Sequence, residues 1–225
     1  GRQTVIGTVE HLKNPSLNAI RTYFNTYYVP NNMGVIMSGD FDPNTVIKKI
    51  DHTFAYMQKK PVPAYSFDPE KPIQTPIVHE VKGPNAEYLF LGFRFPGAAT
   101  KDAQMLNLLG SILTNGSAGL IDLNLLKSQK LLSAGAFPYV LKDYSMLILQ
   151  GNPAQGQTLE EVKVLLLDQL EKLRKGDFSE DLITSIVNNE RKAQISRNVN
   201  YSSRADDLLE NFTSDQDWAN QLRNT

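Results

Sequence analysis

The proline-rich stretch from Lys60 to Pro76 limits most strongly what this chain can fold into. It contains five prolines, and each proline removes a backbone donor and favours extended chain. No sustained apolar periodicity runs through it. The stretch therefore predicts a linker at 60–76, with one folded segment at 1–59 and a second at 77–225.

The segment at 1–59 contains too few predicted helices and strands to form a whole domain. Asn14-Pro15 predicts the start of a helix, and the apolar run Met33–Ser38 reads as a short buried strand. Asp42-Pro43 predicts the start of a second helix. A helix, a strand and a helix leave apolar faces uncovered, so we expect this segment to need a partner sheet that lies upstream of Gly1.

The segment at 77–225 mixes strand and helix signals. Predicted strands are Ile77–Val81, Tyr88–Phe95, Ser133–Leu141 and Met146–Gly151. Predicted helices are Asp102–Leu113, Leu120–Leu126, one that starts at a Thr158/Glu161 capping box and stops at Gly176, one capped by Ser179, and Arg204–Phe212. This order predicts an α+β fold, an antiparallel or mixed sheet packed against helices.

Composition excludes several classes of function. The net charge of −1 gives no field for nucleic acid or an anionic membrane, so neither is expected as a partner. Without cysteine there is no disulfide and no thiol catalysis. No apolar run reaches the roughly 20 residues that span a bilayer. The residues assign no compartment; a periplasmic or other extracytoplasmic location would require a signal peptide on the parent chain, and Gly1–Gly7 shows none.

No group of residues has the spacing of a catalytic or metal site. His11, His52 and His79 do not form the H-x-x-E-H pattern that aims two imidazoles from one helix at one zinc ion. A G-x-S-x-G nucleophile motif is absent. The glycine- and serine-rich Asn115–Gly119 lacks the lysine of a phosphate loop. We predict no catalytic residue and no metal ligand in this chain.

Two stretches carry a family resemblance. Tyr27-Tyr28-Val29-Pro30-Asn31-Asn32-Met33, followed by Ser38-Gly39-Asp40-Phe41-Asp42, resembles the end of the first domain of a pitrilysin/insulinase-type (inverzincin) zinc metallopeptidase. Gly110–Gly135 resembles the next, non-catalytic domain, with its Gly/Ser loop, L-x-x-x-L helix and small-residue strand. The resemblance implies that 1–59 closes a preceding peptidase-like domain and that 77–225 is an inactive pitrilysin-like domain.

The same resemblance implies where the chemistry of the parent enzyme lies. The family's zinc site is on a helix upstream of Gly1, so this chain holds no cofactor, and zinc is expected only in the upstream half. The family's opposing half presents an arginine and, seven residues later, a tyrosine to the scissile carbonyl. Those positions fall on Leu126 and Ser133, which cannot donate as that pair does. Activity would then come from the zinc-bearing half of the same chain or from a partner subunit.

The role that the resemblance leaves is substrate handling. In chamber-forming members, the second domain holds a peptide or small protein through an edge strand and an adjoining glycine loop, using main-chain groups that any sequence offers. The positions that match are Asn115, Gly116, Gly119, Ser133, Ala134, Gly135, Ala136 and Phe137. Ala134, Gly135 and Ala136 are small enough to admit a second backbone. Alternatively, Gly135 only eases the curvature of the sheet.

Two further interpretations stay open at this point. Family members that have lost catalysis act as assembly subunits, so the chain could be a degenerate, inactive scaffold. A free-standing enzyme would instead predict peptide hydrolysis by this chain alone, and we expect none. The leading hypothesis is a substrate-binding and structural segment of a zinc endopeptidase.

Overall fold

The computed structural model describes residues 7–216, apart from the side chain of Gln104. Its internal contacts divide the chain into two units, Gly1–His79 and Glu80–Thr225. Residues 1–6 and 217–225, which the predicted segments include, lie outside the described part. Within that part, no helix is both long and apolar enough to cross a membrane.

The first unit contains short helices and no strand among its described residues. Its elements are α1 (Val9–Lys13), α2 (Leu17–Tyr27), the 3-10 turn η1 (Pro30–Asn32) and α3 (Pro43–Thr53). The start of α2 lies two residues beyond the predicted Asn14-Pro15, because the Ser16 side chain accepts a hydrogen bond from Ala19 N–H. The predicted start of α3 is confirmed, with Asp42 as the cap and Pro43 as the first helical residue.

Two predicted strands are wrong. Met33–Ser38 and Ile77–Val81 have no strand structure, and most of their larger apolar side chains are exposed, Val81 by 91%. A strand needs a neighbour to accept and donate its ladder hydrogen bonds. Among residues 7–216, only β1, β2 and β3 form a ladder, and neither predicted strand pairs with them.

The proline-rich residues 60–76 adopt neither helix nor strand. Asn31 holds the start of this stretch with two hydrogen bonds: its Nδ2 donates to Lys60 O at 2.9 Å and its Oδ1 accepts from Lys60 N–H at 3.1 Å. The Asn31 side chain thus pairs with the backbone of Lys60 as a neighbouring strand would, and this holds the start of the extended stretch beside the η1 turn.

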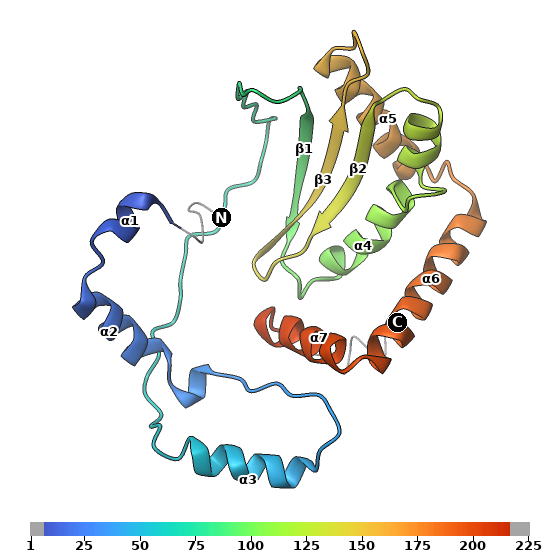
Figure 1. The fold of residues 1–225 in the computed structure, drawn as a ribbon. Coiled ribbons are helices and arrows are strands. Elements are labelled where there is room, and N and C mark those ends of the chain that lie inside the picture. The colour runs from blue at the N-terminus through green and yellow to red at the C-terminus, as the bar shows by residue number, and fades with distance from the viewer. Residues whose placement is uncertain (1–6, 217–225) are drawn as a thin grey trace. The chain divides into compact units, whose positions relative to one another are not determined.

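The second unit is built on a three-stranded antiparallel sheet. Its strands are β1 (Leu89–Pro96), β2 (Ser133–Tyr139) and β3 (Tyr144–Asn152), in the order β1-β3-β2 (Figure 1). The register pairs Leu91 and Ala136 with Leu149, so these three side chains point to one face. That face packs on helices and forms the core, as in an α+β fold, and the predicted fold class is confirmed.

The helices of the second unit follow the predicted capping signals. They are α4 (Lys101–Leu113), the π-helical η2 (Asp122–Lys127), α5 (Leu159–Lys175), α6 (Glu180–Val199) and α7 (Tyr201–Thr213). The capping box of Thr158 and Glu161 opens α5, and Gly176, at φ 69°, ends it. Leu106, Leu125, Val162 and Leu166 are fully buried against the sheet. A single apolar core therefore holds β1–β3, α4, η2 and α5 together.

Candidate functional site

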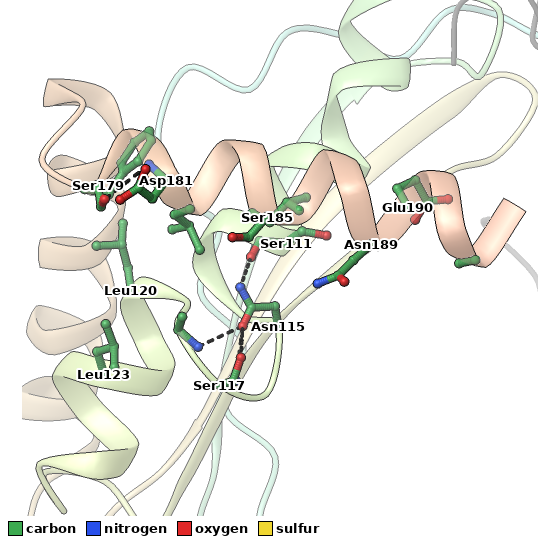
Figure 2. Close-up of a pocket in the computed structure, with 15 residues that line it drawn as sticks. Ser111, Asn115, Ser117, Leu120, Leu123, Ser179, Asp181, Ser185, Asn189 and Glu190 are labelled. Atoms are coloured by element: carbon green, nitrogen blue, oxygen red, sulfur yellow. Dashed lines mark hydrogen bonds between the residues drawn. The ribbon is translucent and has the colours of Figure 1, made fainter.

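In the Asn115–Gly119 loop, the connection between α4 and η2, side-chain oxygens accept from four of the five backbone N–H groups. Asn115 Oδ1 accepts from Ser117 N–H at 3.1 Å and Ala118 N–H at 2.9 Å, while its Nδ2 donates to Ser111 O at 3.1 Å (Figure 2). Gly116 adopts φ 81°, a conformation that favours glycine. Because four of its five N–H groups are already bonded, the loop lacks the row of free donors that holds a phosphate.

The buried carboxylate of Asp122 fixes this loop from beneath. Its Oδ2 accepts from Asn115 N–H at 2.8 Å and from Gly119 N–H at 3.1 Å. Gly119 is buried, and a Cβ on it would lie 2.6 Å from Leu113 O and 2.8 Å from Asp122 Oδ2. Gly119 therefore supports the loop from inside the molecule, whereas Asn115 and Gly116 are exposed on its surface.

The predicted strand residues divide between the two faces of the sheet. Ala134 and Ala136 point to the core, where Ala136 is buried. Ser133, Gly135 and Phe137 alternate with them and point to the opposite face, which no helix of the described unit covers in Figure 1. The Phe137 ring, half exposed, lies over Gly135: a Cβ there would be 2.8 Å from Phe137 Cζ. The space above Gly135 is thus filled by a side chain that can move.

The outer edge of β2, the side away from β3, is covered in its second half by α4. Ala136 N–H donates to Thr114 Oγ1 at 3.0 Å. One helical turn earlier, Gly110 packs against Pro138, whose Cδ is 2.9 Å from the position a Gly110 Cβ would take. Pro138 has no N–H of its own, as is usual at an edge.

What remains at this edge is a short stretch of main chain at the start of β2. Donors alternate in direction along a strand, so Ala134 N–H points outward like that of Ala136. Within the described residues, Ala134 N–H is the one outward donor of Ser133–Phe137 that has no recorded partner. The edge can therefore receive one or two residues of an added strand, not a long one.

A pocket of about 560 Å³ lies on the helical side of the loop. It is formed by the end of α4, the Asn115–Gly119 loop, the start of η2 and one face of α6 (Figure 2). We call it the α6 pocket. Asn115 is the one predicted site residue in its lining. Asp181, Ser185 and Asn189 of α6 also line it, and sequence reasoning missed them, because polar residues four apart are equally typical of a solvated helix face.

The positions that match the family's Arg/Tyr pair carry no comparable donor. Leu126 packs, partly buried, against the core. The Ser133 hydroxyl donates to Asn152 Oδ1 at 2.9 Å. Neither side chain supplies a positive charge or a phenol to a developing oxyanion.

The histidines are dispersed over the first unit, and each is exposed. His11 Nδ1 accepts from Thr8 N–H at 3.3 Å in a capping interaction. Over residues 7–216, no three histidine, aspartate or glutamate side chains are grouped as a metal site requires.

Comparison with known protein families identifies the class to which this α+β architecture, with its loop and small-residue strand, belongs. Residues 15–190 match the family described as the Peptidase M16 inactive domain. The chain therefore belongs to that family, the inactive domain of pitrilysin/insulinase-like metallopeptidases, which is the family that its sequence motifs resemble.

One curated relative is the zinc protease PqqE of Helicobacter pylori, 28% identical over 223 residues. That match covers 95% of this chain and 49% of the relative, so the chain spans about half the relative's length. The crystal structure of a protease from Helicobacter pylori superposes with a TM-score of 0.80 at 24% identity, covering 93% of this chain and 52% of that one. Complex III2 from Candida albicans, Inz-5 bound, contains a chain with a TM-score of 0.67 at 15% identity, covering 94% and 52%. Both structures share the fold of this chain.

Proposed function

We propose that this chain is a non-catalytic, substrate-binding and structural segment of a zinc-dependent endopeptidase of the M16 family. The observation that carries the proposal is the outward Ala134 N–H, without a partner in the described residues, on an edge strand of small side chains. An unpaired main-chain N–H and its neighbouring carbonyl can form hydrogen bonds with the backbone of an extended peptide, whatever the sequence of that peptide. Such binding suits an enzyme that handles many peptides.

The peptide in this proposal lies along Ser133–Phe137 with the Asn115–Gly119 loop beside it. Ala134 supplies the main-chain hydrogen bonds, and Phe137 supplies an apolar surface once its ring moves off Gly135. Asn115 and Gly116 limit the path of the peptide by shape, because their backbone donors are already used or lie in a tight turn. Gly119 and Ala136 keep the loop and the strand in place from the buried side.

The proposed domain organisation assigns 1–59 to the end of a preceding peptidase-like domain, 60–76 to a linker and 77–225 to the inactive domain. Its support is the difference in burial: in the described part of the first unit, Val29 is the one buried residue. The helices α2 and α3 are amphipathic but leave their apolar faces exposed. Such faces need a further sheet to pack against.

Catalysis, in this proposal, comes from a zinc-bearing half of the same chain or from a partner subunit. The support is the relative's own name, zinc protease, together with the half of its length that this chain does not span. The chain alone is then expected to show no chelator-sensitive peptide hydrolysis. Hydrolysis by the purified chain that a chelator abolishes would contradict this assignment.

Nuclear magnetic resonance with the isotope-labelled chain tests the peptide-binding role. On addition of a blocked, unstructured peptide of alternating Ala and Val, we expect the amide signals of Ala134 and Gly135 to shift. A proline variant, Ala134→Pro, removes the outward donor and should abolish those shifts, while Ala134→Gly, which keeps that donor and leaves the β2–β3 ladder intact, serves as the matched control. Unchanged signals at Ala134 and Gly135 at saturating peptide would refute docking on this edge.

An assembly scaffold is the second candidate, favoured by the likeness to a chain of Complex III2. A scaffold would bind a folded subunit through exposed apolar surface and would not need the β2 edge. The two roles are separated by sequencing the parent gene: an upstream H-x-x-E-H with a distal glutamate favours the peptidase, and its loss favours the scaffold.

A further inference from the structure

One exposed carboxylate in the lining of the α6 pocket, that of Asp181 in the first turn of α6, has no ion pair among the described residues. Asp181 and Glu190 are the charged residues in its lining, and no lysine, arginine or histidine lines it. Glu190 Oε1 accepts from Arg197 at 2.8 Å, so its charge is balanced on the helix surface. The Asp181 carboxylate has no ion pair or hydrogen-bond partner recorded among residues 7–216. A ligand for this pocket should therefore bring a positive charge.

Beside Asp181, α6 presents two more polar side chains to the pocket. Ser185 and Asn189 follow at intervals of four residues and thus lie on the same stripe of the helix. Neither side chain has a recorded partner in the described chain. Figure 2 shows Asn189 on the side of α6 that faces Asn115 and Ser185 near Ser111. These hydroxyl and amide groups can bind the peptide groups next to a charged side chain.

The end of the pocket nearest Asp181 has an apolar wall. Leu120 and Leu123 of the helix after the loop lie beneath the start of α6 (Figure 2), and Leu182 of α6 also lines the pocket. Lysine and arginine combine an apolar stem with a charged head, and they bury the stem along apolar surface. The pocket offers the two environments that such a side chain requires, in the same place.

Two other ligand classes fit poorly. An anion would meet Asp181 and Glu190 and would find four of the five loop N–H groups already bonded to Asn115 and Asp122. A single metal ion could not use both carboxylates, since nine helical residues separate them by roughly 13 Å along the axis. The lining of the pocket therefore suits a monovalent organic cation or a neutral polar group better than an anion or a metal ion.

We infer that the α6 pocket binds the lysine or arginine side chain of a peptide. This inference deepens the proposed function, on which it rests for the ligand being a peptide, but it concerns a separate place on the molecule. The β2 edge recognises main chain and is indifferent to sequence, whereas the α6 pocket would add a preference for a basic residue. A peptide long enough to pass the Asn115–Gly119 loop could contact both.

The test compares two blocked tripeptides, acetyl-Ala-Arg-Ala-amide and acetyl-Ala-Gln-Ala-amide, by amide-signal mapping on the isotope-labelled chain. The arginine peptide should shift Ser117, Ser185 and Asn189, and added salt should weaken its binding. The glutamine peptide should bind about threefold to fivefold more weakly, the upper range expected for one solvent-exposed charge pair.

The variant Asp181→Asn should remove that preference, so that both tripeptides bind alike. Glu180→Gln is the matched control: it removes the same charge from the same first turn of α6 but does not line the pocket. Ser185→Trp fills the pocket without changing charge and should abolish binding of both peptides. Equal shifts for both peptides on the wild-type chain, silent signals at Ser185 and Asn189, or an equal effect of Glu180→Gln would overturn the inference.

Failure of the inference can be distinguished from failure of the proposed function. Docking on the β2 edge is read at Ala134 and Gly135, and the α6 pocket is read at Ser185 and Asn189. Shifts at the edge with none in the pocket would reject the basic-residue site alone. Shifts in the pocket with none at the edge would reject edge docking and leave the pocket as the peptide site.

Discussion

The two units of this chain use similar helices in opposite ways. In the first unit, α2 has a well-defined apolar face, yet Leu17 on that face is 59% exposed. In the second unit, Leu149 of β3 is completely buried between α4, α5 and the sheet. An amphipathic helix is stable when its apolar face packs against another element, and within residues 7–216 the second unit contains that packing surface whereas the first does not.

The largest expected effect is that of a leucine-to-alanine substitution in the second unit, compared with the same substitution in the first unit. Leu149→Ala removes a fully buried side chain and should lower the free energy of unfolding by about 3 kcal/mol. Leu17→Ala, in exposed α2, should change it by less than about 0.5 kcal/mol. Denaturant unfolding followed by circular dichroism measures both. Comparable losses would mean that the face of α2 is covered when the chain is in solution, which would remove the contrast.

Next in size is the buried glycine below the loop. Gly119→Ala places a Cβ 2.6 Å from Leu113 O, and because the neighbour is backbone we expect a loss of about 2 kcal/mol in the free energy of unfolding. Gly92→Ala is the control, since nothing lies within 4 Å of the new Cβ in β1. If Gly119→Ala unfolds at the wild-type midpoint, residue 119 is not packed against Leu113 O as described.

A smaller effect is expected where α4 covers the β2 edge. Thr114→Val keeps the shape of the side chain but removes the acceptor of Ala136 N–H, at a cost of about 1 kcal/mol in the free energy of unfolding. Thr26→Val removes an exposed hydroxyl from α2 and should have almost no effect. In the peptide titration, Thr114→Val should also extend the shifted signals to Ala136, because its donor is released.

The smallest effect is electrostatic and depends on pH. Hydrogen bonds from Arg174 and Lys175 lower the pKa of Glu171 from 4.5 to about 2. Because the pKa of Glu171 is lower in the folded chain, its ion pairs stabilise the fold above pH 4.5, and this contribution is lost as the pH falls toward about 2. The melting temperature of Glu171→Gln should therefore lie slightly below that of the wild type at pH 7 and converge with it in acid.

A difference that persisted unchanged at the acidic end of that range would contradict the assignment of the pKa shift. Glu180→Gln serves as the control for loss of a carboxylate without a recorded ion-pair partner. Surface ion pairs contribute little to the free energy of unfolding. This experiment therefore tests the direction of the change in melting temperature, not its size.

Local signals allowed much of the fold to be predicted. The Thr158 capping box, the Gly176 stop and the Ser179 cap each act within a few residues, and the structure contains all three. Strand pairing depends on a distant neighbour, so the apolar runs at Met33–Ser38 and Ile77–Val81 were mistaken for strands. Their residues have strand-forming character, but that character alone provides no partner for the backbone.

The candidate site shows the same limit. The loop and the small-residue strand could be identified from Asn115–Gly119 and Ser133–Phe137, since their composition is unusual. Nothing in the sequence indicated that Thr114 accepts from Ala136 N–H or that Asp122 lies beneath the loop, because both contacts depend on how α4 packs. The sequence likewise does not show that Asp181, Ser185 and Asn189 line one pocket, because this depends on α6 packing beside the loop.

The contact between Thr114 and β2 has a consequence for how the molecule behaves at high concentration. Sheet margins with a full row of free amides act as templates on which identical chains add to one another. Here one hydroxyl and one proline interrupt that row after a single residue, so a second copy could not continue the ladder along β2. The same interruption that keeps the binding stretch short would therefore help protect the protein from ordered aggregation along that margin.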